Sequence, residues 1–450
     1  MLHVGIAVVD ITPRPGLPLM GNYRDDYAAR GVHDPLRARA AVFADSSGNM
    51  AAVLALDICL LDRGNVALIC QAIGRQARVP PENVLVHATH THSAPAANDQ
   101  YSFGMDLAPH RADVEAMLVK AASAVSLAEQ NLAEASLSVG HASEDRISFN
   151  RRLRRRDGTT QMNWEALAPG FDPDLVVEAW GKTDPQVTCL SVERESRPAA
   201  ALVNFALHPA ILAGDNWLYS ADYPGYLAES LTRTLGPEFR CVFLNGCCGN
   251  VNHVDYRDPI QGRGYKMAQR VGYMLGAAAC EAIRGRRPIE AECVAVTKER
   301  VGLERIRFSP DDIRWCEEVA EQARRNPPRG QVDGLPDAYW ADLRLRMFRQ
   351  QDAPADVEVM TIRLGDVAIV GLPGENFCES GLAIKARSPA PHTLVAELSN
   401  DSIGYVPVRE AFAQGGYEPT VGSTQFAPGT AERLVESAVA QLECLFSVQK

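Results

Sequence analysis

The stretch that decides the fold is a short apolar run ending in a histidine cluster, Asn83-Val84-Leu85-Val86-His87-Ala88-Thr89-His90-Thr91-His92-Ser93. Its first residues predict a buried strand, because β-branched and apolar side chains suit a covered, pleated surface. Residues 50–56 predict a strand before it, and residues 65–77 between the two have helical periodicity. Strand, helix and strand at this spacing are typical of an α/β unit, whose functional groups lie where strands end and loops begin.

The alternation of strands and helices continues along the chain. Further strands are predicted at residues 4–9, 40–43, 136–140, 199–207, 242–244 and 368–372, and further helices at 112–131, 265–283 and 431–446. Ser309-Pro310-Asp311-Asp312 predicts another helix start, since it combines a serine cap, an early proline and acids in the first turn. The charged segment around it, at about 305–352, predicts a helical insertion on the core or a lid. Residues 151–157, with five arginines, predict a solvated loop.

The composition is that of a soluble globular protein, with 46% hydrophobic and 22% charged residues among 450. A formal net charge of -11 argues against nucleic acid, which needs a basic face, and leaves a small molecule as the expected partner. The apolar runs are shorter than the roughly 18 residues of a membrane span. The N-terminus lacks a signal-like pattern and the eleven cysteines form no CxxC pair, so we expect reduced thiols and a cytoplasmic location. The oligomeric state is not readable from the sequence.

Residues suited to metal or proton chemistry follow several predicted strands. In an extended segment alternate side chains share a face, so His90 and His92 should point the same way. Their spacing suits two ligands of one metal, one ligand with a proton-transfer group, or core histidines bonded to backbone. His208 ends another apolar strand and can converge on the same site. Glu375, after a Pro-Gly turn, is placed to be a hard ligand or a general base.

Two further features leave alternatives open. Tyr405 and Tyr417 lie in glycine-rich loops, where tyrosines face a ligand or simply pack. Cys247-Cys248 lies in a turn after a strand, and a cysteine there could be a nucleophile activated by a nearby histidine. The sequence contains neither a GxSxG elbow nor a GxxxxGK[ST] loop, which argues against serine hydrolases and P-loop proteins.

Taken together, these residues resemble the neutral/alkaline non-lysosomal ceramidase family, specifically its N-terminal catalytic domain. The resemblance extends from about residue 3 to 425, as separated motifs in the order of the family. Those motifs are Gly5 to Pro13 with Met20-Gly21, Gly31-Val32-His33 with Arg37 to Ala40, Thr89 to Ser93, Asn150-Arg151, Asn204 to His208, Gly374-Glu375 and Gly404-Tyr405. The spacing of Tyr405 and Tyr417 also resembles a tyrosine pair of the family.

The resemblance implies an α/β fold with a mixed-sheet core flanked by helices, in a single large domain over residues 1–450. It implies a zinc ion held by four residues, His90, His208, Glu375 and Tyr405. It also implies that His92 moves the proton, while Arg151 and Tyr417 steady the substrate carbonyl. Zinc lowers the pKa of a bound water towards about 7, so the water can attack a carbonyl near neutral pH.

Family members that cleave ceramide are typically exported and carry a further C-terminal β-sandwich domain, and we expect neither feature here. We therefore predict a zinc-dependent hydrolase of a carbon–nitrogen bond in a small soluble amide. One alternative is a zinc-dependent lactone or ester hydrolase, or a non-hydrolytic cyclase acting on a related carbonyl substrate. Another is a family member that binds a ligand without turnover, against which the presence of all seven candidate residues counts.

Overall fold

The computed structural model describes the whole chain except residues 1, 25, 99–104, 259–260, 327–334 and 448–450. Its largest sheet has nine strands and is mixed, because the β4–β5 and β12–β14 pairs are parallel and the other neighbours are antiparallel. The strand order is β14 (Arg240–Asn245), β12 (Arg197–Phe205), β11 (Gln186–Arg194), β6 (Ala133–Ser143), β1 (Leu2–Asp10), β3 (Arg37–Ala44), β4 (Met50–Leu56) and β5 (Val84–Ala88), with β16 (Arg287–Pro288) also on β6.

A second sheet packs on the inner face of the first. Its order is β17 (Val294–Leu303), β18 (Ala355–Leu364), β19 (Val367–Gly371) and β21 (His392–Ala396). One hydrophobic cluster joins the two sheets, with Leu85 and Leu202 from the first and Ile362 and Ile369 from the second. Burial of such side chains is the main favourable term in folding, so this interface fixes how the two sheets face each other.

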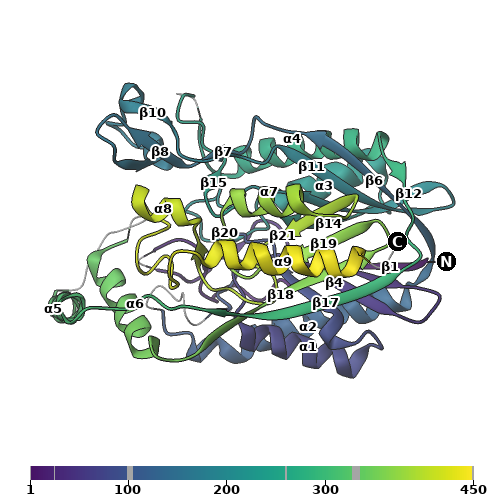
Figure 1. Cartoon of the computed structure of the whole chain (residues 1–450), viewed down its shortest axis with the longest axis horizontal. Helices are drawn as coiled ribbons and strands as arrows, with labels where there is room; N and C mark the ends of the chain where they lie inside the picture. The colour runs from purple at the N-terminus through teal and green to yellow at the C-terminus, as the bar shows by residue number, and fades with distance from the viewer. Residues whose placement is uncertain (1, 25, 99–104, 259–260, 327–334, 448–450) are drawn as a thin grey trace.

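Helices cover both outer faces (Figure 1). The first sheet carries α1 (Arg63–Gln76) and α2 (Arg111–Gln130) on one half and α3 (Tyr223–Leu235) and α4 (Tyr265–Arg284) on the other, each pair with its own buried cluster. The second sheet carries α9 (Thr430–Phe446), and α7 (Cys378–Arg387) lies beside α9. The layers are thus helix, sheet, sheet and helix, which confirms the predicted α/β fold with a mixed-sheet core flanked by helices.

Short elements complete the fold around the ends of these strands. Two-residue ladders are formed by β2 (Gly31–Val32) with β13 (Leu218–Tyr219), β7 (Phe149–Asn150) with β15 (Val251–Asn252), and β20 (Glu375–Asn376) with β22 (Tyr405–Val406). A small sheet has the order β10 (Val176–Ala179), β8 (Arg152–Arg155), β9 (Thr160–Met162). Outside the charged segment near 305–352, the other helices of the described residues are α8 (Arg409–Gln414) and the 3-10 turns Pro81–Asn83, Ala108–His110, Asn163–Leu167 and Pro173–Leu175.

The charged segment near 305–352 lies between the antiparallel strands β17 and β18. It contains α5 (Pro310–Arg325) and α6 (Asp337–Gln350), which project to one side of the sheets in Figure 1. The predicted start of α5 is confirmed: Ser309 Oγ accepts a hydrogen bond from the Asp312 backbone N–H, and the Asp312 carboxylate accepts one from Ser309 N–H. Both helices therefore leave and re-enter the fold at neighbouring strand ends.

The predicted solvated loop at residues 151–157 is wrong for residues 151–155, and only Arg156 and Asp157 form an exposed turn. Residues 152–155 form strand β8, and the side chains of Arg151 and Arg152 are only 3% and 1% exposed. Both guanidinium groups pair with the fully buried carboxylate of Glu418. A charged run is solvated only when no buried counter-charge meets it, and here the counter-charge lies more than 260 positions away along the chain.

Two properties of the described residues concern their helices and their cysteines. None of their helices is both long enough and apolar enough to cross a bilayer. All eleven cysteines fall within the described ranges, and all are free thiols.

Gly140→Ala should destabilise the fold, because a Cβ at Gly140 would lie 1.8 Å from the backbone oxygen of Ala282 in α4. Only a shift of α4 away from β6 relieves that clash, and we expect a loss of about 1–3 kcal/mol in the free energy of unfolding, measured by urea denaturation. Gly302→Ala is the matched control, since Gly302 also lies in a strand and its Cβ would meet no atom within 4 Å. Equal losses in both variants would contradict the close packing of α4.

Candidate metal centre

The two histidine-bearing strand ends lie close together because a side-chain contact joins the two outermost strands of the first sheet. β5 and β14 are the outermost strands of that sheet, yet the backbone N–H of Asn245 at the end of β14 donates to His87 Nε2 in β5 at 3.0 Å. His87 Nδ1 in turn donates to the Glu397 backbone oxygen at 2.7 Å. Burial lowers the pKa of His87 to about 4, so it stays neutral and can donate and accept at once. His87 is thus a structural histidine that joins three strand ends.

His90 reaches the site through an unusual backbone conformation. Its φ is 76°, in the left-handed region that non-glycine residues adopt only where surrounding contacts impose it. The His90 N–H donates to the Ile58 oxygen at 2.9 Å and the His92 N–H to the Pro209 oxygen at 3.3 Å. The predicted convergence of His90 and His92 is therefore present, but the assumed extended segment is not its cause.

Three ligand-type atoms, from His90, His208 and Glu375, lie close enough together to bind one ion. His90 Nε2 is 3.0 Å from His208 Nε2 and 3.3 Å from Glu375 Oε2, and His208 Nε2 is 3.9 Å from the same Glu375 oxygen. His92 Nε2 also lies 3.3 Å from His90 Nε2. A tetrahedral ion with bonds of about 2.0–2.1 Å separates its ligand atoms by roughly 3.3 Å, so this set fits a zinc-sized ion.

Backbone oxygens fix the tautomers of His90 and His208, and these tautomers leave the Nε2 atoms free to bind a metal. His90 Nδ1 lies 3.0 Å from the Cys59 backbone oxygen, and His208 Nδ1 lies 3.3 Å from the Cys248 backbone oxygen. Both contacts require the proton on Nδ1, which leaves each Nε2 lone pair for a ligand. Arg151 Nη1 lies 3.5 Å from His208 Nδ1 and favours the opposite tautomer, but it is the longer contact and a metal on Nε2 selects the first.

Glu375 and Tyr405 come to the site on a shared two-stranded ladder. β20 and β22 are parallel, and Glu375 and Tyr405 are direct partners across it. Glu375 is 5% exposed, and its Oε2 has no hydrogen-bond partner among the described residues. A buried carboxylate oxygen without a donor is costly unless a cation neutralises it. The unsatisfied Oε2 of Glu375 is therefore evidence that this set of ligand atoms fits a metal ion.

A second group of possible ligands shares His90 but fits less well. Cys59, His90 and His92 also place ligand atoms close together. Cys59 Sγ, however, lies 3.7 Å from His90 Nδ1, the nitrogen that donates to the Cys59 backbone oxygen. An ion on the Cys59 side would have to displace that proton, whereas an ion among His90, His208 and Glu375 would not.

The charges of the three imidazoles are coupled. Burial disfavours the charged form of His90, but Cys59 and Glu375 raise its pKa well above the ordinary value. Burial, together with the charge on His90, lowers the pKa of both His92 and His208 well below that value. The rings of His92 and His208 are therefore neutral and each has a nitrogen lone pair to offer. The three imidazoles together favour a single positive charge.

His92 is held by contacts on its other side. Its Nδ1 lies 3.5 Å from Asn22 Oδ1, and Arg24 Nη2 donates to its backbone oxygen at 3.5 Å. Gly21 has a φ of 107°, and a Cβ there would lie 2.4 Å from the His92 ring, so only glycine allows the ring this close. These contacts keep His92 Nε2 turned towards His90.

Arg151 lies on the opposite wall, beside the two tyrosines. Its Nε donates to Glu418 at 2.7 Å, its guanidinium lies 5.2 Å from the Tyr405 ring, and its Nη2 has no hydrogen-bond partner among the described residues. The Tyr405 and Tyr417 rings are 5.5 Å apart. Burial raises the pKa of both phenols, and Arg151 opposes that shift. The structure thus brings all seven predicted residues to one place.

Glu397 is a site residue that the sequence did not suggest. It is fully buried, and its Oε1 accepts from Cys248 Sγ at 2.8 Å while its Oε2 accepts from the Asn376 N–H at 2.8 Å. One carboxyl therefore supports the residue after Glu375 and the turn that orients His208. Burial raises its pKa to about 8. No local signal marks Glu397, because both of its partners lie in other parts of the chain.

The cysteine nucleophile considered from the sequence finds no support. Burial raises the pKa of Cys247 and Cys248 well above the ordinary value, and Glu397 adds to the shift in both. A nucleophilic cysteine needs the opposite, a thiolate stabilised by nearby positive charge. These thiols act as buried small side chains, and Cys248 also donates a hydrogen bond.

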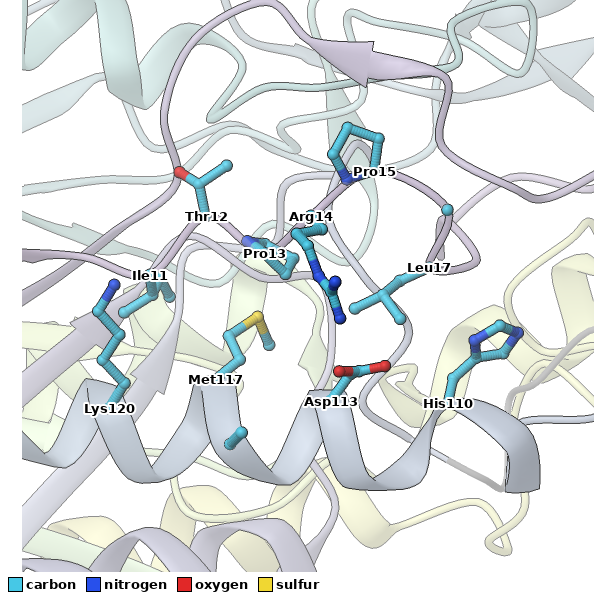
Figure 2. Close-up of a pocket in the computed structure, with 12 residues that line it drawn as sticks. Ile11, Thr12, Pro13, Arg14, Pro15, Leu17, His110, Asp113, Met117 and Lys120 are labelled. Atoms are coloured by element: carbon cyan, nitrogen blue, oxygen red, sulfur yellow. The ribbon is translucent and has the colours of Figure 1, made fainter.

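A cavity of about 510 Å³ lies elsewhere in the molecule, between the loop after β1 and helix α2 (Figure 2). Its lining includes Arg14, Asp113 and Lys120, and none of the seven predicted site residues. This cavity is therefore separate from the metal centre.

Glu397→Ala should lower the affinity for zinc by about 10–100-fold, the usual effect of removing a group that orients ligands. The affinity is measured by competition with a chelator of known constant, and Glu397→Gln, which keeps the volume, should give a smaller loss. Glu379→Ala is the matched control, because Glu379 accepts two comparable hydrogen bonds, from Lys182 N–H and Asn250 Nδ2, away from the ligands. Unchanged zinc affinity in folded Glu397→Ala would contradict the orienting role.

Comparison with known proteins matches this geometry to one family. Residues 2–240, more than half of the chain, match the family model described as neutral/alkaline non-lysosomal ceramidase, N-terminal. The neutral ceramidase of Mycobacterium tuberculosis is 24% identical over 95% of this chain and 74% of its own length. Neutral ceramidase B of Dictyostelium discoideum is 28% identical over 50% of this chain and 30% of its own length.

A solved structure agrees at the level of the fold. The crystal structure of neutral ceramidase from Pseudomonas aeruginosa superposes with a TM-score of 0.74 at 19% identity, covering 98% of this chain and 75% of that one. Family membership supports a hydrolase that acts on an amide bond. The chain belongs to the neutral/alkaline non-lysosomal ceramidase family.

Proposed function

We propose that this chain is a zinc-dependent amidohydrolase, with the zinc held by His90, His208, Glu375 and Tyr405. The observation that carries the proposal is the convergence of two Nε2 atoms and an unsatisfied carboxylate oxygen within 3.0–3.9 Å. The bound ion would supply Lewis-acid activation of water and of the substrate carbonyl. All other steps follow from side chains of the chain itself.

His92 is the proposed proton carrier. Its Nδ1 faces Asn22 and its neutral Nε2 faces the centre, so the ring can take a proton from the attacking water. It then gives that proton to the leaving nitrogen as the carbon–nitrogen bond breaks and the carbon–oxygen bond remains. The products are a carboxylic acid and an amine. A neutral base beside the donor set favours hydrolysis over a cyclisation, which needs no attacking water.

Arg151 and Tyr417 are the proposed groups that hold the carbonyl oxygen. Arg151 Nη2 is buried without a partner among the described residues, so it has a hydrogen bond to give to a substrate. Glu418 holds the other side of the guanidinium, which keeps the Nη2 direction fixed. Donors fixed in a dry site stabilise the negative charge that grows on the oxygen during attack.

The proposed substrate is an N-acylated lipid amide. The sequence favoured a small soluble amide, but the similar proteins above are ceramidases by name, and that class favours a lipid substrate. An ester or lactone has the same reacting carbonyl and is included in the test. The cytoplasmic location stays a prediction.

Zinc-loaded protein should hydrolyse N-palmitoyl sphingosine in mixed micelles, lose this activity on chelation and regain it with zinc. His92→Ala should keep about one zinc per chain and lose turnover by about 10²–10⁴-fold, because the proton transfer is lost. His141→Ala, a surface histidine outside the centre, is the control. Loss of zinc in His92→Ala would make His92 a ligand, and full activity of the chelated parent, or faster turnover of a matched lactone than of any amide, would overturn the proposal.

A further inference from the structure

Two partly buried indole rings flank Tyr417 at the outer side of the metal centre. The Tyr417 ring lies 5.6 Å from the Trp164 ring and 6.1 Å from the Trp340 ring, both in edge-on arrangements. Exposure increases outward, since Tyr405 beside Glu375 is buried, whereas Tyr417 and both tryptophans are partly exposed. The aromatic cluster Trp164, Trp340 and Tyr417 therefore links the buried centre with solvent.

Trp340 comes from the segment between β17 and β18. It lies in α6, and its ring packs against the loop that carries Tyr417 at Gly422, which has no side chain. Gly422 has a φ of 118°, and a Cβ there would lie 2.8 Å from the Trp340 ring. Arg344, one turn further along α6, donates from Nε to the Val421 backbone oxygen at 2.9 Å. These contacts fix α6 against the loop at the level of the site.

The cluster offers an apolar surface next to a polar one. Arg151 lies 5.3 Å from the Trp164 ring, so the group proposed to hold the carbonyl is in contact with the aromatic cluster. Indole rings combine a large apolar face with one N–H donor, which suits a boundary between a dry site and water. A chain attached to a carbonyl held by Arg151 and Tyr417 would lie across these rings.

We propose that Trp340, together with Trp164, contacts the hydrocarbon chain of the substrate and that α6 thereby sets the preference for chain length. The inference rests on the proposed amide hydrolysis for its turnover readout, but not for its binding readout. On this proposal, the charged α5–α6 segment contributes to the site through one apolar side chain, that of Trp340.

The turnover test compares N-acetyl, N-octanoyl and N-palmitoyl amides of one amine. In Trp340→Ala the ratio of kcat/KM for the palmitoyl over the acetyl amide should fall about tenfold, as expected from losing contact with about two methylene groups. Trp340→Phe should keep most of the ratio. Trp315→Ala is the control, because Trp315 lies on α5 in the same segment and its ring contacts Arg344 instead of Tyr417. An equal loss for every chain length, or no change in the ratio, would overturn the proposal.

The binding test separates this inference from the proposed function. Metal-free protein should bind palmitate more tightly than octanoate by calorimetry, and Trp340→Ala should reduce that difference while Trp315→Ala should not. Length-dependent fatty-acid binding in a protein that hydrolyses no amide would support the inference and contradict only the proposed function. Amide hydrolysis with a chain-length profile unchanged by Trp340→Ala would contradict only the inference.

Discussion

Two imidazole nitrogens and a carboxylate oxygen lie close together in the interior, with a third imidazole beside them, and this constraint accounts for much of the surrounding structure. His90, His92, His208 and Glu375 are at most 7% exposed, so water cannot satisfy them. Lone pairs packed this closely repel one another unless a cation lies between them. Other interactions of the fold therefore have to hold these side chains together, and these interactions come from separate parts of the chain.

One of these interactions joins the two outermost strands of the first sheet. His87 joins β5 to the end of β14, which places the residues after β5 and β12 on the same side of the interior. Glu397 then connects this edge to the Glu375 ladder through Asn376 and Cys248. His90, which follows β5, has a left-handed φ of 76° at this edge. Strain at such a position persists only where its surroundings over-determine it.

A second buried group holds the opposite wall. Glu418 pairs with Arg151 and Arg152 with no exposure on its carboxylate. Removing one partner of a buried pair typically costs about 3–5 kcal/mol, because the other charge is left unpaired. The position of Arg151 therefore depends on the fold that brings Glu418 beside it. Its Nη2 is buried and has no hydrogen-bond partner among the described residues.

The strand pattern and most of the site could be read from the sequence, because both depend on local signals. Apolar runs located β5, β12 and β19, and the polar residues that follow such runs gave His90, His208 and Glu375. What could not be read depends on partners distant in the chain. Arg151 and Arg152 looked solvated because Glu418 is far away, and Glu397 gave no signal because its role exists only after folding. The left-handed φ of His90 was equally invisible, since the Ile58 oxygen that accepts from its N–H lies in another part of the chain.

The central claim is the identity of the ligands, and diffraction at the zinc absorption edge tests it most directly. Crystals of zinc-loaded protein should show one anomalous peak within bonding distance of His90 Nε2, His208 Nε2, Glu375 Oε2 and the Tyr405 hydroxyl, with His92 beside the ion and not bound to it. A peak bonded to Cys59 and His92, or no peak at this centre in protein that retains zinc, would contradict the account.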